Sequence, residues 1–384
     1  MQAQSDLLKV GIVGLGKMGL SHLAMVRPHP SVDLVGMCDT SGYTLGVLEK
    51  YTGIKAFKDF GAFISEVEMD AIFIATPSTT HAWMVKAALE QGLHVFCEKP
   101  FTLTAKDADE LTALAKEKGL VTQVGYHNRF VGAFQEVKRL LELGAIGEVT
   151  HVTGEAYGPV VLKPKGGTWR TQSTAGGGCL YDYAAHAINL VNWYIGEPIG
   201  VGGTVLNSVF SKETDDEVFS TLFYPGGLSS QISVSWSDES QRKMSTRIHV
   251  FGTKGRIYVD RQECQVYLRD TATPPPGYDF GWNVKYTTDL TEPVWFYLRG
   301  EEYSAQIDAF VQNSLAGKTE NANDFASAAM TDRVMAMMIA DARRGPTTTE
   351  GSNVEMVPVK RRSGGLFGWL KNTASAKLGT AGAA

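Results

Sequence analysis

Residues 10–19 read Val10-Gly11-Ile12-Val13-Gly14-Leu15-Gly16-Lys17-Met18-Gly19, and this stretch decides how the N-terminal part of the chain folds. The apolar run Lys9–Val13 predicts a strand, and the G-x-G-x-x-G spacing after it predicts a tight turn that opens a helix. In such a turn the first glycine permits the bend, the second lets a pyrophosphate approach the backbone, and the third lets helix and strand pack closely. Free N–H groups at the start of the helix then face the anion. The stretch therefore predicts a dinucleotide-binding turn made by Gly14, Leu15, Gly16, Lys17, Met18 and Gly19.

An aspartate follows this turn at the sequence spacing that is typical of a ribose-binding carboxylate. Asp39 lies twenty residues beyond Gly19, at the end of a second predicted strand, Val32–Cys38. A carboxylate there accepts the two hydroxyls of an adenosine ribose and repels a 2′-phosphate. Thr40 and Ser41 come next, with no arginine to receive that phosphate. The sequence therefore predicts NAD as the cofactor, in preference to NADP.

Strand and helix patterns alternate through the first 126 residues. Further strands are predicted at Ala71–Ala75, His94–Cys97 and Val121–Gly125, and the clearest helices at Thr80–Gln91 and Ala105–Lys118. This alternation predicts a parallel sheet with helices on both faces.

Ligands bind such sheets in the crevice beyond the C-terminal ends of the strands. Thr76 and Pro77 end one strand, so we expect them to pack near the cofactor. His81, on the next helix, is either a cofactor contact or a structural residue of the first helical turn.

The pattern changes after about residue 127. A helix over Ala133–Leu143 and an extended segment over Glu148–Tyr157 precede a glycine-rich loop and a helix near Asp182–Tyr194. Strands without intervening helices follow, at Gly202–Phe210, Glu217–Tyr224, Leu228–Trp236, Thr246–Phe251, Arg256–Asp260 and Gln265–Arg269. Short turns between successive strands predict an antiparallel sheet. We expect a long loop over residues 271–295, and then helices near Glu302–Leu315 and Asp324–Ala342.

Two motifs supply candidate chemistry. Cys97-Glu98-Lys99-Pro100 ends a strand at the crevice edge, where a lysine can hold a ribose hydroxyl and a substrate hydroxyl together. Asp182 and His186 are four residues apart and share one face of a helix. A histidine is well suited to take the proton of an alcohol near neutral pH, and the aspartate can orient its ring or contact the substrate. The alternatives are a surface turn for the first motif, and a helix-capping aspartate with a packed histidine for the second.

These motifs together resemble one family. GLGKMG, ATPSTTH, CEKP and GGGCLYDYAAH, in this order and before a strand-rich second half, resemble the Gfo/Idh/MocA oxidoreductases, the relatives of glucose–fructose oxidoreductase and inositol dehydrogenase. The resemblance covers residues 8 to about 345. It implies an α/β NAD-binding Rossmann domain, residues 1–127, and an α+β domain, residues 128–362, with a large, open, mostly antiparallel sheet. One face of that sheet would cover the active site and the other would form a dimer interface, so we expect a homodimer or homotetramer.

The resemblance also implies roles for individual residues. Lys99, Asp182 and His186 match the catalytic set, with His186 as the acid/base, and Glu98 joins the cofactor-binding residues. The substrate-binding candidates are Asn128, Arg129, Lys163, Trp169 and Arg170. His127, which precedes Asn128 after the last predicted strand of the Rossmann domain, also falls in that crevice. Asn189 stands where many relatives have aspartate, and Ala185 replaces a frequent glycine or cysteine. Both departures leave the three catalytic positions intact.

The implied function is NAD-dependent oxidation, or reversible reduction, of a secondary hydroxyl of a sugar. Lys163, Lys165 and Arg170 form a basic segment with room for a phosphate or carboxylate. Residues 297–303 resemble an RG-containing stretch of relatives in polysaccharide biosynthesis, so a sugar is favoured, with a nucleotide-linked sugar as one form of it. An inositol or other free polyol follows closely. An NAD-dependent glycosidase, a transhydrogenase that keeps its cofactor and a non-catalytic dinucleotide-binding regulator stay open as alternatives.

Composition excludes several other classes of protein. The chain has 384 residues, of which 43% are hydrophobic and 20% charged, which fits two domains with ample cores. A net charge of −5 argues against a nucleic-acid partner, and the apolar runs are too short to span a bilayer. The N-terminus does not resemble a secretory signal. Four well-separated cysteines exclude a disulfide scaffold and a zinc module, so we expect no metal and a cytoplasmic protein.

The C-terminal tail differs from the rest of the chain. From Lys360 onward it has basic but no acidic residues, and residues 365–371 mix aromatic side chains with glycine. We expect residues 363–384 to be a disordered tail, with weak anchoring on anionic lipid as the alternative.

Overall fold

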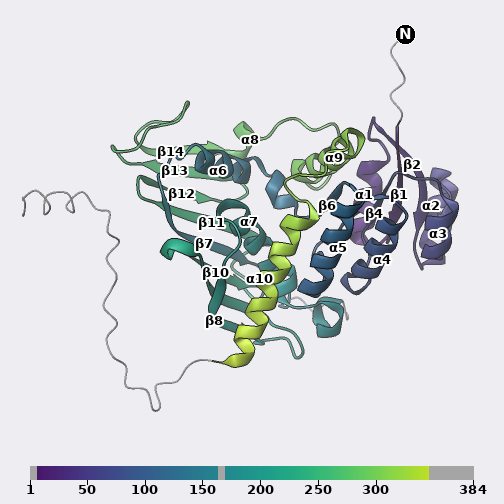
Figure 1. Cartoon of the computed structure of the whole chain (residues 1–384), viewed down its shortest axis with the longest axis horizontal. Coiled ribbons are helices and arrows are strands. Elements are labelled where there is room, and N and C mark those ends of the chain that lie inside the picture. The colour runs from purple at the N-terminus through teal and green to yellow at the C-terminus, as the bar shows by residue number, and fades with distance from the viewer. Residues whose placement is uncertain (1–6, 163–168, 346–384) are drawn as a thin grey trace, which may run out of the picture. The chain divides into compact units, whose positions relative to one another are not determined.

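The structure is a computed structural model that describes residues 7–162 and 169–345. These residues belong to one compact unit that contains two β-sheets (Figure 1). The tail predicted over residues 363–384 lies outside the described residues, as does most of the basic segment around Lys163.

The first sheet has six parallel strands. Their order is β3-β2-β1-β4-β5-β6. The strands are β1 (Leu8–Val13), β2 (Val32–Cys38), β3 (Ala56–Phe57), β4 (Ala71–Ile74), β5 (His94–Cys97) and β6 (Thr122–Val124). The order reverses between β1 and β4, and parallel sheets of this type bind ligands at that reversal. The predicted glycine turn and Thr76 follow β1 and β4, so they lie on either side of it.

Helices cover both faces of this sheet, which explains why its strands read as continuous apolar runs. The helices between the strands are α1 (Lys17–Val26), α2 (Gly42–Thr52), α3 (Phe60–Glu66), α4 (Ser78–Glu90) and α5 (Ala105–Glu117). Several begin at a capping side chain: Ser41 accepts from the Thr44 N–H at the start of α2, and Thr104 accepts from the Asp107 N–H at the start of α5.

A helix from much later in the sequence also packs on the first sheet. Phe310 of α9 (Glu301–Ala316) contacts Phe73 and Phe96, with ring centroids 5.2 Å and 5.8 Å away. The last helix, α10 (Phe325–Arg344), packs against α5 and against α7 (Ala185–Ile195). The chain therefore returns to the nucleotide-binding half after it has built the second sheet. The domain ranges 1–127 and 128–362 stay predictions.

The second sheet has eight strands, in the order β14-β13-β12-β11-β7-β10-β9-β8. They are β7 (Val149–Tyr157), β8 (Gly200–Asn207), β9 (Glu217–Phe223), β10 (Ser229–Ser235), β11 (Ser245–Gly252), β12 (Gly255–Val259), β13 (Glu263–Leu268) and β14 (Gly281–Tyr286). All neighbouring strands in the described sheet are antiparallel except β7 and β10, which are parallel. The predicted fold class is confirmed.

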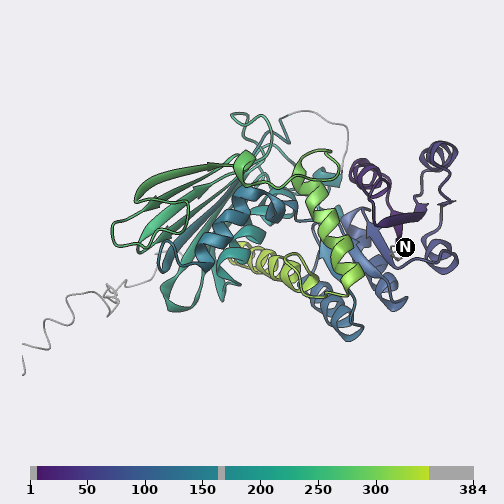
Figure 2. The ribbon, with the colours of Figure 1, turned by 90° about the horizontal axis from the view of Figure 1, so that it is seen from above.

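One face of the second sheet packs on helices. These helices are α6 (Gly132–Glu142), α7 and α10, and the sheet lies to one side of them in Figure 2. The opposite face carries alternate side chains of each strand, among them Trp282 and Tyr286 of the edge strand, each about half exposed (50% and 55%). A sheet face of this kind is a candidate contact surface.

The prediction of a loop over residues 271–295 is wrong. This segment contains β14 and a short helix, α8 (Thr287–Leu290). The prolines at its start suggested a loop, but Trp282, Val284 and Tyr286 alternate with more buried residues at strand spacing and pair with β13.

Within residues 7–162 and 169–345, no helix is both long and apolar enough to cross a bilayer.

Candidate active site

Each of the three glycines in the turn is suited to its position for a different reason. Gly14 has φ +86°, and a Cβ atom there would lie 2.7 Å from the backbone of Ala75. A Cβ at Gly19 would overlap the carbonyl oxygen of Gly14. A Cβ at Gly16 would meet no protein atom within 4 Å, so packing does not require this glycine. Gly16 is also the N-cap of α1, and the open space above it fits the approach of a dinucleotide pyrophosphate.

Asp39 lies against this turn, as its spacing predicts. Its Oδ2 accepts a hydrogen bond from the Leu15 N–H at 2.5 Å, and its Oδ1 accepts one from the Ser41 N–H at 2.7 Å. The carboxylate is thereby fixed beside the phosphate-binding main chain. The residues present fit a dinucleotide, with Asp39 placed to receive its ribose.

His81 sits behind the crevice and holds two strand ends together. It is buried, with Nδ1 2.8 Å from the carbonyl oxygen of Pro100 and Nε2 3.0 Å from that of Thr76. Burial lowers the pKa of His81, which favours the neutral ring. Because both nitrogens face main-chain carbonyls, the geometry favours the structural role over a cofactor contact. Thr76 lies beside Gly14, and Pro77 caps α4.

Glu98 connects α1 to the turn that carries Lys99. Its Oε1 is 2.7 Å from Nε2 of His22, and its Oε2 accepts from the Lys99 N–H at 3.2 Å. Burial alone would raise the pKa of Glu98, but the hydrogen bond and charge of His22 and the charge of Lys99 outweigh it and hold the pKa below its usual value. Glu98 is thus a buried anion that fixes the position of its neighbour.

Lys99, Arg170 and Asp182 form an ionic cluster between the two halves of the fold. The Lys99 Nζ contacts Asp182 Oδ1 directly, and the Arg170 Nε donates to Asp182 Oδ2 at 2.8 Å. Burial alone would raise the pKa of Asp182, but the charges of Lys99 and Arg170 hold it well below its usual range. The cluster therefore brings together two predicted catalytic residues and one predicted substrate residue.

His186 lies one helical turn beyond Asp182, where a π-helical turn (Leu180–Ala184) passes into α7. The ring is buried, its Nδ1 has no hydrogen-bond partner, and no described residue donates to it or accepts from it. Burial lowers the pKa of His186 to about 3, and the nearby charge of Lys99 acts in the same direction. The imidazole is therefore neutral near pH 7, and its Nδ1 is not engaged by a protein group.

The remaining predicted substrate residues divide into two groups. Asn128 is buried with both side-chain amide atoms unpartnered, so it keeps its candidacy. Arg129 stays a prediction too, but its guanidinium is bonded within the protein: its Nε donates to Asn189 Oδ1 at 2.7 Å, and its Nη1 and Nη2 donate to main-chain carbonyls of Ala322 and Asn189. Arg129 holds α7 to the segment before α10, because every guanidinium nitrogen already has a protein acceptor. Lys163 and the side chain of Trp169 lie outside the described residues.

A second group of side chains lies beside His186, and sequence reasoning assigned none of them a role in the site. His127 lies with its ring centroid 5.0 Å from that of His186, and it stacks on Tyr303. Arg261 contacts both His127 and Glu302. His127 was expected in the crevice from its place after the last strand of the first sheet, but without a role of its own. Glu302 and Tyr303 belong to the stretch 297–303, which was noted only for its resemblance to relatives in polysaccharide biosynthesis. Arg261 comes from a segment that no motif marks.

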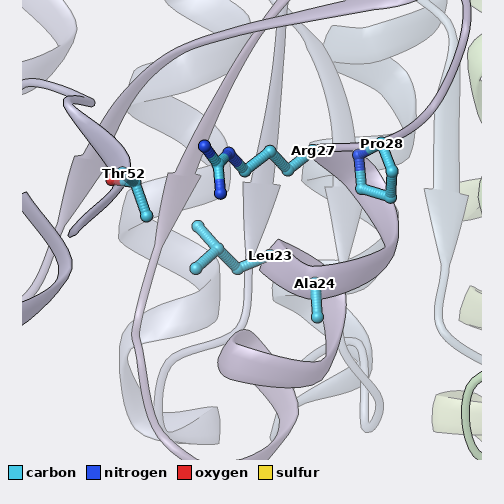
Figure 3. A pocket seen from close by; sticks show the side chains of 5 residues that line it. All are labelled: Leu23, Ala24, Arg27, Pro28 and Thr52. Atoms are coloured by element: carbon cyan, nitrogen blue, oxygen red, sulfur yellow. The ribbon is translucent and has the colours of Figure 1, made fainter.

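A surface hollow lies away from this site. Leu23, Ala24, Arg27, Pro28 and Thr52 line a hollow of about 550 Å³ at the end of α1 away from the glycine turn (Figure 3). Its lining is mainly apolar and has a single ionisable side chain, Arg27. It carries none of the predicted chemistry.

Comparison with known proteins identifies the family. Residues 8–126 match the oxidoreductase family with the NAD-binding Rossmann fold, and residues 134–258 match the GFO/IDH/MocA C-terminal domain. The chain belongs to the Gfo/Idh/MocA oxidoreductase family. The predicted resemblance is confirmed, and so is an NAD-binding Rossmann fold.

Individual relatives are more distant. The chain is similar to myo-inositol 2-dehydrogenase of Thermotoga maritima, with 27% identity over 275 residues that cover 68% of this chain and 78% of that protein. It is also similar to inositol 2-dehydrogenase of Rhizobium meliloti, with 24% identity over 321 residues, or 80% and 93% of the two chains. Levoglucosan dehydrogenase, solved with NADH and levoglucosan, shares the fold, with a TM-score of 0.77 and 22% identity over 88% of this chain and 98% of that one.

Proposed function

We propose that this Gfo/Idh/MocA protein is a dehydrogenase that oxidises a secondary hydroxyl of a sugar or polyol with NAD and reduces the ketone in reverse. The observation that carries the proposal is the contact of Lys99 with the buried Asp182 at the crevice edge of the first sheet, with the buried His186 one helical turn beyond Asp182 and within reach of the Lys99 charge. Relatives named as inositol dehydrogenases support the reaction class.

Each residue has a distinct task in this reaction. Bound NAD supplies the hydride acceptor, and the glycine turn with Asp39 fits it. The neutral imidazole of His186 takes the hydroxyl proton, and Lys99, held by Asp182, donates to the hydroxyl oxygen. Proton transfer by a positioned histidine contributes roughly 10²–10⁴-fold, and the rest comes from positioning and from the cofactor.

The cofactor preference is part of the proposal. Asp39 is held in place by two main-chain N–H groups, so its negative charge cannot swing away from a 2′-phosphate. Repulsion of that phosphate favours NAD over NADP.

For the substrate we favour a free polyol such as an inositol over a nucleotide sugar. Arg170, one of the cations expected to receive a phosphate, donates to Asp182. Lys163 and Lys165 lie outside the described residues. The relatives named above act on inositols by their names, which supports the polyol.

We further propose that the chain forms a homodimer or a larger homo-oligomer through the open face of the second sheet. Trp282 and Tyr286 are half exposed on that face, and the Arg256 guanidinium lies 5.2 Å from the Trp282 ring. Light scattering of the wild type and of Trp282→Glu tests this. A lower mass for the variant supports the interface, and a monomeric wild type contradicts it. A cytoplasmic location stays a prediction from the sequence.

Absorbance of reduced nicotinamide tests the proposed reaction. Purified protein receives NAD and, in separate samples, inositols, free sugars and nucleotide sugars, after a check for cofactor that is already bound. Reduction with one class establishes the dehydrogenase and selects the substrate class. No reduction with any class, while NAD is demonstrably bound, contradicts the proposal and favours a regulator or an NAD-dependent glycosidase with no net reduction.

A further inference from the structure

His127 lies beside His186 in the buried site, but its surroundings suit a hydrogen-bond donor and not a proton acceptor. It begins the 3₁₀ turn His127–Phe130 after β6 and is 5% exposed. Its ring lies 4.5 Å from that of Tyr303, at the start of α9, with an interplanar angle of 18°. This stacking fixes the plane of the imidazole next to His186, whose ring centroid is 5.0 Å away.

Arg261 decides which nitrogen of His127 carries the proton. Arg261 lies in the turn between β12 and β13. Its Nη1 is 3.3 Å from His127 Nε2. A guanidinium has only donors, so Nε2 must be the acceptor and the proton of the neutral ring sits on Nδ1. Glu302, which is buried, contacts the same guanidinium through its Oε1 and holds it in place.

His127 also stays neutral. Burial lowers its pKa well below the usual value, and the positive charges of Arg261, Lys99 and Arg299 act in the same direction. The tautomer argument stands on the geometry, and this electrostatic setting excludes the imidazolium as a competitor. Among the described residues, the side-chain hydrogen bond of His127 is the one between its Nε2 and Arg261, so His127 presents its Nδ1–H as one fixed donor.

We propose that His127 positions the substrate by donating its Nδ1–H to an oxygen next to the reacting hydroxyl, with Arg261 as the residue that fixes this tautomer. The inference rests on the proposed dehydrogenase function. Sugars and inositols carry oxygens on adjacent carbons, so one hydroxyl can face His186 while its neighbour accepts from His127. The site then requires a vicinal oxygen acceptor, and an alcohol without one binds poorly.

Nitrogen NMR of protein labelled with ¹⁵N-histidine tests the tautomer without any substrate. The wild type should show His127 with its proton on Nδ1, with the signal assigned by its loss in His127→Asn. Arg261→Met should release the ring to protonate Nε2, whereas Arg242→Met, an exposed arginine of the loop before β11, should change nothing. A wild-type His127 that is protonated on Nε2, or is charged near pH 7, overturns the proposal.

Two substitutions of His127 test the donation itself. The amide nitrogen of asparagine can occupy the Nδ1 position, whereas that of glutamine reaches only the Nε2 position. For the polyol that the wild type oxidises, we expect His127→Gln to raise KM about tenfold, the usual worth of one hydrogen bond, while His127→Asn stays within about threefold. NAD affinity and thermal unfolding, measured on both variants, should match the wild type.

The outcomes separate the inference from the proposed function. Equal KM values for the two variants, or a parallel loss of NAD affinity, overturn the donor role while the dehydrogenase stands. A wild type that oxidises no polyol overturns the proposed function, and the donor role falls with it. The tautomer measurement still decides the role of Arg261.

Discussion

The glycine turn and the Lys99–Asp182–His186 cluster lie at the same edge of the first sheet but are built in opposite ways. The turn consists of main-chain groups from consecutive residues, and each of its glycines has a local geometric reason. The cluster consists of side chains, and its central contact joins residues 83 positions apart. The cofactor half of the site is therefore encoded locally, whereas the chemical half exists only when both sheets have formed and packed together.

The two regions also differ in how their charges are coupled. Asp39 is held by neutral N–H donors, so a change elsewhere leaves it unaffected. In the cluster, Lys99 acts on Asp182 and His186 at once. A single substitution in the cluster should therefore change both turnover and its pH dependence. A single substitution in the turn should change one property, such as NAD affinity or stability.

Apart from removal of the base His186 itself, the largest effect should come from Lys99→Met. The variant removes the donor to the hydroxyl oxygen and leaves Asp182 with Arg170, so turnover should fall by roughly 10²–10³, as for loss of one preorganised donor. Steady-state kinetics measures this, with Lys106→Met, an exposed lysine of α5, as the matched control. Wild-type turnover in Lys99→Met would mean that the cluster is structural.

Two alanine substitutions in the turn should separate binding from folding. The added methyl of Gly16→Ala meets no protein atom, so stability should hold while NAD affinity falls by roughly 10–100-fold through crowding of the pyrophosphate. Gly19→Ala collides with the Gly14 carbonyl and should lose about 1–3 kcal/mol of folding free energy or more. Calorimetric NAD titration and thermal unfolding measure the two quantities. Equal NAD affinity in Gly16→Ala and in the wild type would contradict the binding of the pyrophosphate at this turn.

Asp39→Asn should change selectivity more than stability. Removing the charge weakens the contact with the ribose hydroxyls and relieves repulsion of a 2′-phosphate, so the preference for NAD over NADP should fall about tenfold or more. Asp33→Asn, an exposed aspartate of the same strand, is the control. An unchanged ratio of the two affinities would assign the preference to other residues.

The smallest effect should appear in the pH profile. His186 acts as a base only when it is neutral, and burial lowers its pKa to about 3. Titration of His186 should therefore not change the rate of alcohol oxidation between about pH 8 and pH 5. The rate assigned to this group should fall only as pH drops towards the lowered pKa. In Lys99→Met the fall should begin at higher pH, because a charge that depresses the pKa is gone. A profile in wild type that declines through pH 6–7, with the variant unchanged, argues for a different base.

The fold was predictable where it depends on local pattern. The predicted strand Val32–Cys38 has those bounds, and the helix expected at Ala105–Lys118 ends one residue earlier. The return of α9 to the first sheet was not predictable, because an apolar helix face does not specify which sheet it covers. Strand β14 was missed because nearby prolines suggested a loop, although its alternation of side chains was present in the sequence.

The site divides in the same way. Motif and spacing led to Lys99, Asp182, His186 and Asp39, and the structure brings the first three together. The substrate-binding role of Arg129 stays a prediction, and its hydrogen bonds to Asn189 and Ala322 could not be read from its position beside the crevice. Arg261 has no motif around it and reaches the site from a turn of the second sheet. Long-range contacts of this kind cannot be read from one-dimensional spacing.

His186→Ala, with turnover and NAD affinity measured on the same preparation, tests the central claim most directly. Removing the base should lower turnover by roughly 10²–10⁴ and leave NAD affinity within about twofold, because the turn that binds the cofactor is untouched. His249→Asn, a histidine of β11 outside the site, controls for handling. Full turnover in His186→Ala, or an equal loss of turnover and NAD affinity, would contradict the assignment of His186 as the acid/base.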